Sequence, residues 1–235
     1  MIIGKAQRYQ DTRSHVRAIL GGERGLYVIT DIDSSRDPTL VRRVEAAIDG
    51  GARIVQYRNK ASLEAYPFTD RLAEARELAD LCLKRQVCFI VNDDADLAAE
   101  CGADGVHLGR DEDCQIERLA AQAAEARTML YGASCYNSLE RAAERRQLGA
   151  HYLAFGRFFP SSTKPAAVAA SIALLQQARR QFDCPLVAIG GINAGNAGPL
   201  IEAGADWIAV VGSVFSRDSL NGIHDAAAEL VALFN

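Results

Sequence analysis

The sequence predicts a single (β/α)8 TIM barrel, an α/β fold in which eight parallel strands alternate with helices. Eight short apolar runs occur along the chain, each followed by a helical pattern. Continuous apolar runs are typical of parallel strands that are covered on both faces. A phrase of small residues also ends a helix and enters the next strand four times, starting at Gly51, Gly102, Gly149 and Gly204. This spacing of roughly 50 residues corresponds to two strand–helix units of a repeating barrel.

The expected elements alternate in chain order. We expect strands at residues 26–30, 53–57, 87–91, 105–107, 129–132, 151–155, 186–189 and 207–211. We expect helices at residues 38–49, 69–85, 94–101, 116–126, 138–148, 167–181, 194–203 and 224–234. Pro38 suits the first turn of its helix, and the repeated glycines suit the left-handed position that ends one. This order favours the barrel over a doubly wound open sheet.

Composition indicates one globular domain over residues 1–235, with residues 1–23 as a short helical extension. The chain is 49% hydrophobic and 24% charged, and no Pro/Gly/Ser-rich linker divides it. The extension lacks the apolar core of a signal peptide, and no run approaches a membrane span. The net charge of −4 argues against bulk attraction to nucleic acid or an anionic membrane.

The six cysteines form no C-x-x-C pair, and most lie in apolar or helical surroundings. We therefore interpret them as reduced packing residues and predict a cytoplasmic protein. A homo-oligomer is compatible with the sequence, which does not specify the number of subunits.

Polar residues and glycines follow the predicted strands at their C-terminal ends, where barrels of this kind carry their active sites. These residues are Gln56, Arg58, Lys60, Asn92, Asp93, His107, Ser134, Gly190, Gly191, Gly212 and Ser213. After the sixth strand, residues 156–165 form a turn-rich loop with Ser161, Ser162, Thr163 and Lys164. Hydroxyls and a lysine on a loop are suited to binding phosphate oxygens.

Three subsites are predicted at this rim. Arg58, Lys60 and Lys164 are placed to clamp a polyanion such as pyrophosphate. Asp93 and an acid at 111–113 are candidates for holding Mg²⁺, which favours carboxylates together with substrate phosphate oxygens. The glycine-rich ends of the seventh and eighth strands match the phosphate site of many barrels, with Asn193 as an N-cap behind it.

Each feature also has a purely structural interpretation. Asp93 and Asp94 could simply begin a helix, where carboxylates favour the positive end of the dipole. Gly190-Gly191 could be a tight turn, and His107 a hydrogen-bonded wall residue. Trp207 is interpreted as packing. The joint occurrence of phosphate-type loops, cations and acids on one face favours a functional site.

Five motifs in order resemble those of thiamine phosphate synthases, over residues 26–215. They are Val55-Gln56-Tyr57-Arg58-Asn59-Lys60, Val91-Asn92-Asp93, Gly105-Val106-His107-Leu108-Gly109, the loop 156–165 and Ala188-Ile189-Gly190-Gly191-Ile192. The resemblance implies a (β/α)8 transferase that uses Mg²⁺. It would join hydroxymethylpyrimidine diphosphate to a thiazole phosphate, carboxylated or not, and release pyrophosphate.

The resemblance also implies roles for individual residues. Those facing the pyrimidine diphosphate would be Gln56, Arg58, Lys60, Asn92, Ser134 and Lys164, with Tyr57, Asn59 and His107 beside them. Asp93 and Glu112 would hold Mg²⁺. The thiazole phosphate would be held by Ser161, Ser162, Thr163, Gly191, Val211 and Gly212.

Two positions depart from the family pattern. The family commonly has Asp where Glu112 stands, so Asp111 or Asp113 could serve as the second metal ligand instead. It often has Ser where Gly212 stands, so a side-chain contact to phosphate could be replaced by the backbone or by Ser213. The alternative functions are a thiazole tautomerase-like isomerase and a non-catalytic barrel that binds a phosphorylated metabolite.

Overall fold

The computed structural model describes residues 20–32, 37–110, 115, 129–160 and 168–235, and it confirms the predicted barrel. The strands are β1 Gly25–Ile29, β2 Ile54–Tyr57, β3 Cys88–Asn92, β4 Gly105–Leu108, β5 Leu130–Tyr136, β6 Tyr152–Gly156, β7 Leu186–Ile189 and β8 Trp207–Val210. Each strand pairs in parallel with the next, and β1 also pairs with β8, which closes the sheet.

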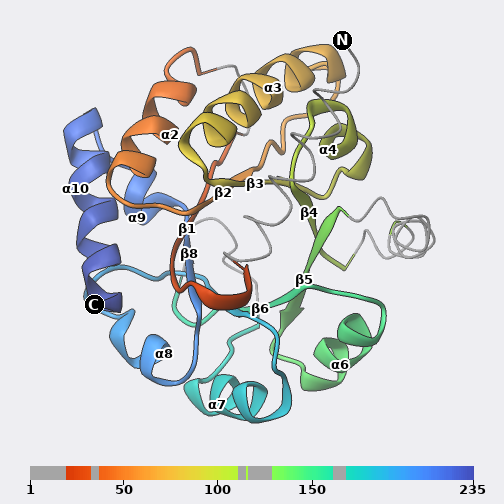
Figure 1. Ribbon diagram of the computed structural model, residues 1–235, viewed down its shortest axis with the longest axis vertical. Coiled ribbons are helices and arrows are strands. Elements are labelled where there is room, and N and C mark those ends of the chain that lie inside the picture. Colours follow the sequence, from red (N-terminus) through yellow and green to blue (C-terminus); the bar gives the residue numbers. More distant parts are fainter. Residues whose placement is uncertain (1–19, 33–36, 111–114, 116–128, 161–167) are drawn as a thin grey trace.

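The helices surround the closed sheet, as Figure 1 shows. They are α2 Leu40–Asp49, α3 Phe68–Arg85, α4 Ala95–Cys101, α6 Leu139–Gln147, α7 Ile172–Gln181, α8 Gly198–Glu202, α9 Gly212–Phe215 and α10 Leu220–Val231, followed by the 3₁₀ helix η1 Ala232–Phe234. The helix expected at 116–126 lies outside the described residues.

Alternating strand residues divide the core into two clusters. The outer cluster joins strand residues such as Leu26 and Val28 to the covering helices. The interior cluster takes the intervening residues, including Tyr27, Ile29 and Tyr152. Trp207 belongs to this interior cluster and is completely buried, so its predicted packing role is confirmed. Leu20, from the N-terminal extension, is 4% exposed and packs against the same cluster.

The four repeated glycines have the left-handed backbone that the sequence predicted. Gly51, Gly102, Gly149 and Gly204 have φ angles of 100°, 77°, 91° and 106°. Each lies at or just after the end of a helix, where a residue with a Cβ would be strained. These turns return the chain to the N-terminal ends of the strands and leave the opposite rim to the functional loops.

Three helix predictions need correction near their starts. Helix α7 begins at Ile172, not at 167, because the Ser171 side chain caps it by accepting a hydrogen bond from Leu174 N at 3.1 Å. Helix α10 begins earlier than expected, after the cap at Ser219. Helix α8 is short and Asn193 does not cap it, because the Asn193 side chain instead accepts from Gly195 N within a preceding turn. The short helix α9 was not expected.

Five of the six cysteines lie in the described part of the chain, where they are buried and form no disulfide. Cys114 lies outside the described residues. Among the described residues, no helix is long and apolar enough to cross a membrane.

Candidate active site

A cavity of about 420 Å³ opens at the C-terminal ends of the strands. Ten of the predicted site residues line it, namely Gln56, Arg58, Asn92, His107, Ser134, Gly190, Gly191, Val211, Gly212 and Ser213. Much of the remaining wall is apolar, with Ile29, Val187 and Ile189 among its residues. The site therefore combines a few polar groups with a water-excluding wall, as small-molecule sites generally do.

A second cavity of about 390 Å³ adjoins the first at Asn92, which lines both. Its wall carries Asn59, Lys60 and Asp93, together with Asp94 and Arg71. This cavity is rich in charged groups, whereas the first is mainly apolar. The two together can accept a molecule that is flat at one end and highly charged at the other.

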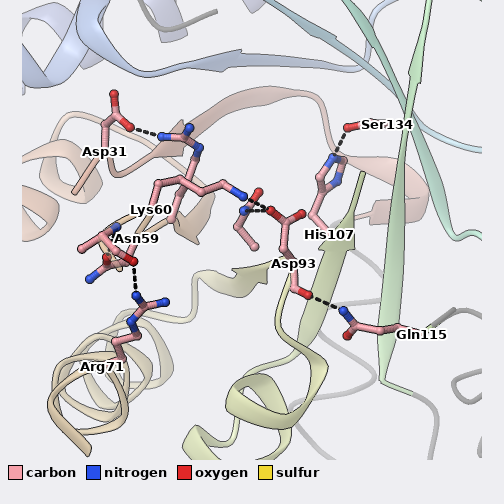
Figure 2. Close-up of polar contacts among 11 residues, drawn as sticks. Asp31, Asn59, Lys60, Arg71, Asp93, His107, Gln115 and Ser134 are labelled. Atoms are coloured by element: carbon pink, nitrogen blue, oxygen red, sulfur yellow. Dashed lines mark hydrogen bonds and ion pairs between the residues drawn. The ribbon is translucent and has the colours of Figure 1, made fainter. Parts of the chain in front are cut away.

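Arg58 lines the first cavity, where contacts with Thr30 and Asp31 anchor it. Its guanidinium donates to the Asp31 carboxylate (Figure 2). Its backbone N–H donates to the Thr30 hydroxyl oxygen at 2.9 Å. The Arg58 side chain is 13% exposed. Burial lowers the pKa of Arg58 while the Asp93 carboxylate opposes that shift, and the guanidinium stays charged.

Asp93 directly follows β3 and contacts Lys60 in the wall of the second cavity. One carboxylate oxygen accepts from the Lys60 ammonium and from the Asn92 amide, the latter at 2.6 Å (Figure 2). Asp93 has a left-handed backbone with φ 64°. The side chain of Gln115 holds this turn, donating to Asp93 O at 2.7 Å and accepting from Ala95 N at 3.1 Å.

The two neighbouring acids have separate tasks. Asp94 caps helix α4, because its side chain accepts a hydrogen bond from Leu97 N at 2.8 Å. Both acids line the second cavity, but Asp93 does not cap the helix. The expectation that this acidic pair begins a helix is therefore met by the Asp94 cap.

Beneath the first cavity, a chain of hydrogen bonds crosses the barrel interior. Gln56 Nε2 donates to Tyr27 Oη at 2.7 Å, and the Tyr27 and Tyr152 hydroxyls are 3.0 Å apart. His107 Nδ1 lies 3.0 Å from Tyr152 Oη, and His107 Nε2 lies 2.9 Å from Ser134 Oγ. We call these five residues the interior chain. It connects Gln56 to Ser134, two residues that both line the cavity.

The loop after β6 rests on the end of β7. Phe158 N donates to Ile189 O and Phe159 N donates to Gly190 O. A Cβ at Gly190 would lie 2.3 Å from Arg157 Cβ, and one at Gly191 would lie 2.3 Å from Pro160 O. Both glycines also have positive φ, so the close approach of this loop requires them. Ser161, Ser162, Thr163 and Lys164 lie outside the described residues, as does Glu112.

The structure corrects the expectation for Tyr57 as a substrate contact. Its side chain is buried on the outer face of β2, where its hydroxyl donates to the Glu74 carboxylate at 2.8 Å. Successive strand residues point to opposite faces, so Gln56 and Tyr57 cannot both face the barrel interior. Asn59 lines the second cavity while its amide contacts Tyr57 and the backbone of Ala61.

Sequence reasoning missed several residues of this site. Tyr27 and Tyr152 look like ordinary apolar strand residues, and Asp31 like the polar end of β1. Tyr136 also lines the cavity, and the guanidinium of Arg110 lies 4.8 Å from its ring centroid. The alternation of strand residues was the available signal, since Tyr27 shares the inward face with Ile29.

Comparison with known proteins identifies the family. A family model described as thiamine monophosphate synthase matches residues 26–214. The chain belongs to this family. It is therefore an enzyme of thiamine biosynthesis, a transferase that forms thiamine phosphate.

Two curated relatives are called thiamine-phosphate synthase. The protein of Thiobacillus denitrificans is 47% identical over 89% of this chain and 94% of its own length. The protein of Nitrosococcus oceani is 47% identical over 83% of this chain and 87% of its own. Among solved structures, thiamine phosphate pyrophosphorylase from Pyrococcus furiosus has a TM-score of 0.74 and is 31% identical, covering 93% of this chain and 96% of that one.

Proposed function

We propose that the two cavities together bind the two substrates of thiamine phosphate synthesis. In this reaction, 4-amino-5-hydroxymethyl-2-methylpyrimidine diphosphate reacts with 4-methyl-5-(2-phosphoethyl)thiazole, carboxylated or not. Pyrophosphate leaves, and CO₂ leaves as well when the thiazole is carboxylated. The observation that carries the proposal is the junction at Asn92 between an apolar cavity and a charged one. An apolar wall suits the heterocycles. A wall that carries Lys60 and Arg71 beside acids able to hold Mg²⁺ suits the diphosphate.

Arg58 and Lys60, with Lys164, are proposed to bind the diphosphate. In the ligand-free chain, Arg58 pairs with Asp31 and Lys60 pairs with Asp93. A diphosphate carries several negative charges and accepts bidentate hydrogen bonds, so it competes effectively for both cations. Gln56 is proposed to form hydrogen bonds with the aminopyrimidine, because an amide offers a donor and an acceptor side by side.

Asp93 is the proposed ligand for Mg²⁺, with Glu112 as the second. The Asp93 side chain is 21% exposed and its carboxylate faces the charged cavity, which suits a cation that keeps water and substrate oxygens as ligands. Within the described residues, no three His, Cys, Asp or Glu side chains form a cluster that could hold a metal. This fits Mg²⁺ bound by one or two carboxylates plus the diphosphate better than a closed protein cage. When bound, Mg²⁺ would neutralise negative charge on the diphosphate oxygens.

The thiazole phosphate is proposed to bind at the ends of β7 and β8. Gly191, Val211 and Gly212 line the cavity there. Ser161, Ser162 and Thr163, in the segment after β6, would supply hydroxyl donors. This places the thiazole phosphate across the cavity from the diphosphate, with the reacting atoms between them.

To catalyse this reaction, the protein must position the reactants and stabilise the charge that develops. The bond from the pyrimidine methylene carbon to the diphosphate oxygen breaks, leaving a pyrimidine-stabilised cation and a diphosphate of growing charge. Arg58 and Lys60 stabilise that charge, which lowers the barrier. The thiazole nitrogen then attacks the carbon with its own lone pair, so no general base is required. The apolar wall keeps water from attacking the cation, and the two phosphate sites hold the reactants in line.

Pyrophosphate release tests this function directly. The protein is mixed with both substrates and Mg²⁺, and each substrate alone serves as the control. We expect pyrophosphate and thiamine phosphate in equal amounts, and only when both substrates are present. Ligand binding without release would instead support a non-catalytic binding protein. Conversion of the thiazole phosphate alone would support a tautomerase-like isomerase, which has no diphosphate to bind at Arg58 and Lys60.

Three further proposals concern the chain as a whole. The first is that residues 1–235 form one domain, because the eight strands of the described residues make a single closed sheet. The second is a cytoplasmic location, because the five described cysteines are buried and form no disulfide. Homo-oligomer formation stays a prediction that gel filtration with light scattering would test.

A further inference from the structure

Two buried tyrosines form the middle of the interior chain, and Tyr27 also lines the first cavity. Tyr27 and Tyr152 are 1% and 0% exposed, and each carries one hydroxyl proton. Burial raises the pKa of Tyr27 and Tyr152 far above the ordinary value, so both are neutral hydroxyls at physiological pH. A neutral hydroxyl donates one hydrogen bond and accepts others, which gives the chain a direction.

The direction follows from the amide at one end. Because Gln56 Nε2 donates to the Tyr27 oxygen at 2.7 Å, the Tyr27 proton is available to Tyr152, 3.0 Å away. The Tyr152 proton is then directed to His107 Nδ1, also at 3.0 Å. A nitrogen that accepts carries no proton, so the neutral imidazole keeps its proton on Nε2.

The other end of the chain faces the cavity. With its proton on Nε2, His107 donates to Ser134 Oγ at 2.9 Å. The Ser134 hydroxyl proton is thereby left to point into the cavity that Ser134 lines. If the hydrogen bonds ran in the opposite direction, the Ser134 hydroxyl would donate to His107 Nε2. Only the lone pairs of the Ser134 oxygen would then face the substrate.

We propose that Tyr27 and Tyr152 are positioning residues that hold His107 in its Nε2–H tautomer and so make Ser134 a hydrogen-bond donor toward the substrate. The inference deepens the proposed function and rests on it for the identity of the acceptor, a group on the pyrimidine diphosphate. A donor at Ser134 attracts diphosphate oxygens or ring nitrogens, whereas lone pairs would repel them.

Packing holds the chain in this arrangement. The His107 and Tyr152 rings are stacked with centroids 5.6 Å apart, and the Tyr27 ring meets Tyr152 edge-on at 6.2 Å. A Cβ at Gly132 would lie 1.9 Å from the Tyr152 ring, so this glycine makes room for the tyrosine. Rings that are packed on several sides keep their hydroxyls at one position, as a directional chain requires.

Nitrogen NMR of ¹⁵N-histidine-labelled protein reads the tautomer directly, and a His107→Gln spectrum identifies the signals of His107. In the wild type we expect a protonated Nε2 and an unprotonated Nδ1. Tyr152→Phe removes one oxygen, so we expect a mixture of tautomers and a fall in kcat of about tenfold, with KM for the thiazole phosphate nearly unchanged. Tyr27→Phe leaves the Tyr152 proton in place, and we expect a smaller tautomer change and a fall of roughly threefold.

Tyr131→Phe is the matched control. Tyr131 is also a buried tyrosine of a strand, but it belongs to the outer core cluster. We expect this variant to keep the His107 signals and kcat of the wild type. A protonated Nδ1 in the wild type, or a Tyr152→Phe enzyme with unchanged tautomer and kcat, would overturn the proposal. A wild type that releases no pyrophosphate would defeat the proposed function, while the tautomer measurements would still decide the direction of the chain.

Discussion

The rim above β2 and β3 and the barrel interior beneath it hold polar groups in different ways. At the rim, Lys60 and Asp93 form an ion pair whose side chains are 45% and 21% exposed. In the interior, neutral hydroxyl, amide and imidazole groups are buried and bonded to one another. Burying a charge costs far more than burying a hydrogen-bonded neutral group. Groups that must exchange a carboxylate for a diphosphate therefore stay near water, and groups that must keep one orientation are buried.

Lys60→Ala gives the largest expected effect at the rim. We expect pyrophosphate release to fall about 10² to 10³-fold, because the lysine faces the departing diphosphate. The free energy of unfolding should change by no more than about 0.5 kcal/mol, since exposed ion pairs contribute little. Steady-state kinetics and chemical denaturation measure the two quantities.

Arg53→Ala is the matched control for Lys60→Ala. Arg53 precedes the same strand at its other end and forms a similar exposed ion pair, with Glu23 at 3.2 Å. We expect the small stability change without the loss of activity. Equal losses of activity in the two variants would contradict the assignment of function to one rim.

Asp93→Asn tests whether Asp93, and not its neighbour Asp94, binds Mg²⁺. We expect the Mg²⁺ concentration for half-maximal activity to rise about tenfold or more, because Mg²⁺ prefers a carboxylate to an amide. Asp94→Asn makes the same change in charge one residue along, but Asn caps a helix as well as Asp does. Its Mg²⁺ dependence and its stability should therefore match the wild type. A shift at Asp94 and none at Asp93 would place the metal elsewhere.

Gly191→Ala and Gly149→Ala compare two glycines with positive φ. At Gly191 a Cβ would meet Pro160 O at 2.3 Å, whereas at Gly149 no atom lies within 4 Å. We expect Gly149→Ala to cost about 1 kcal/mol of stability from backbone strain, with normal kinetics. Gly191→Ala should cost more and raise KM for the thiazole phosphate about tenfold, because the loop must move. Identical kinetics in the two variants would show that the loop contact is not needed.

Raising the pH or adding a thiol reagent tests the buried cysteines, and here we expect the smallest effect on activity. Burial raises the pKa of Cys101 to about 11 and that of Cys135 to about 12. Their neutral thiols contribute stability that is complete below about pH 8.5, the unfolded value, and is lost as pH rises toward the folded values. We expect the free energy of unfolding to fall from pH 8 to pH 10, and a thiol reagent at pH 8 to leave these two residues unmodified. Rapid modification of either in the native protein would contradict their burial.

Much of the fold was predictable because each part of it leaves a local pattern. Strands covered on both faces read as apolar runs, and helices that end in a left-handed turn need a glycine such as Gly51 or Gly204. The rim was predictable for the same reason, since polar residues that follow parallel strands all lie at the end of the barrel where those strands end. The helix starts were less predictable, because the caps at Ser171 and Ser219 compete with equally plausible starts nearby.

The sequence by itself determined the order of the elements, the family and the end of the barrel that carries Arg58, Lys60 and Asp93. Only the tertiary structure decided which tyrosines face inward. Tyr27 and Tyr152 join the interior chain, whereas Tyr57 and Tyr131 pack outside the sheet. Both faces of a barrel strand are buried, so hydropathy cannot distinguish them. Hydrogen bonds between β1, β2, β4, β5 and β6 exist only once the sheet has closed.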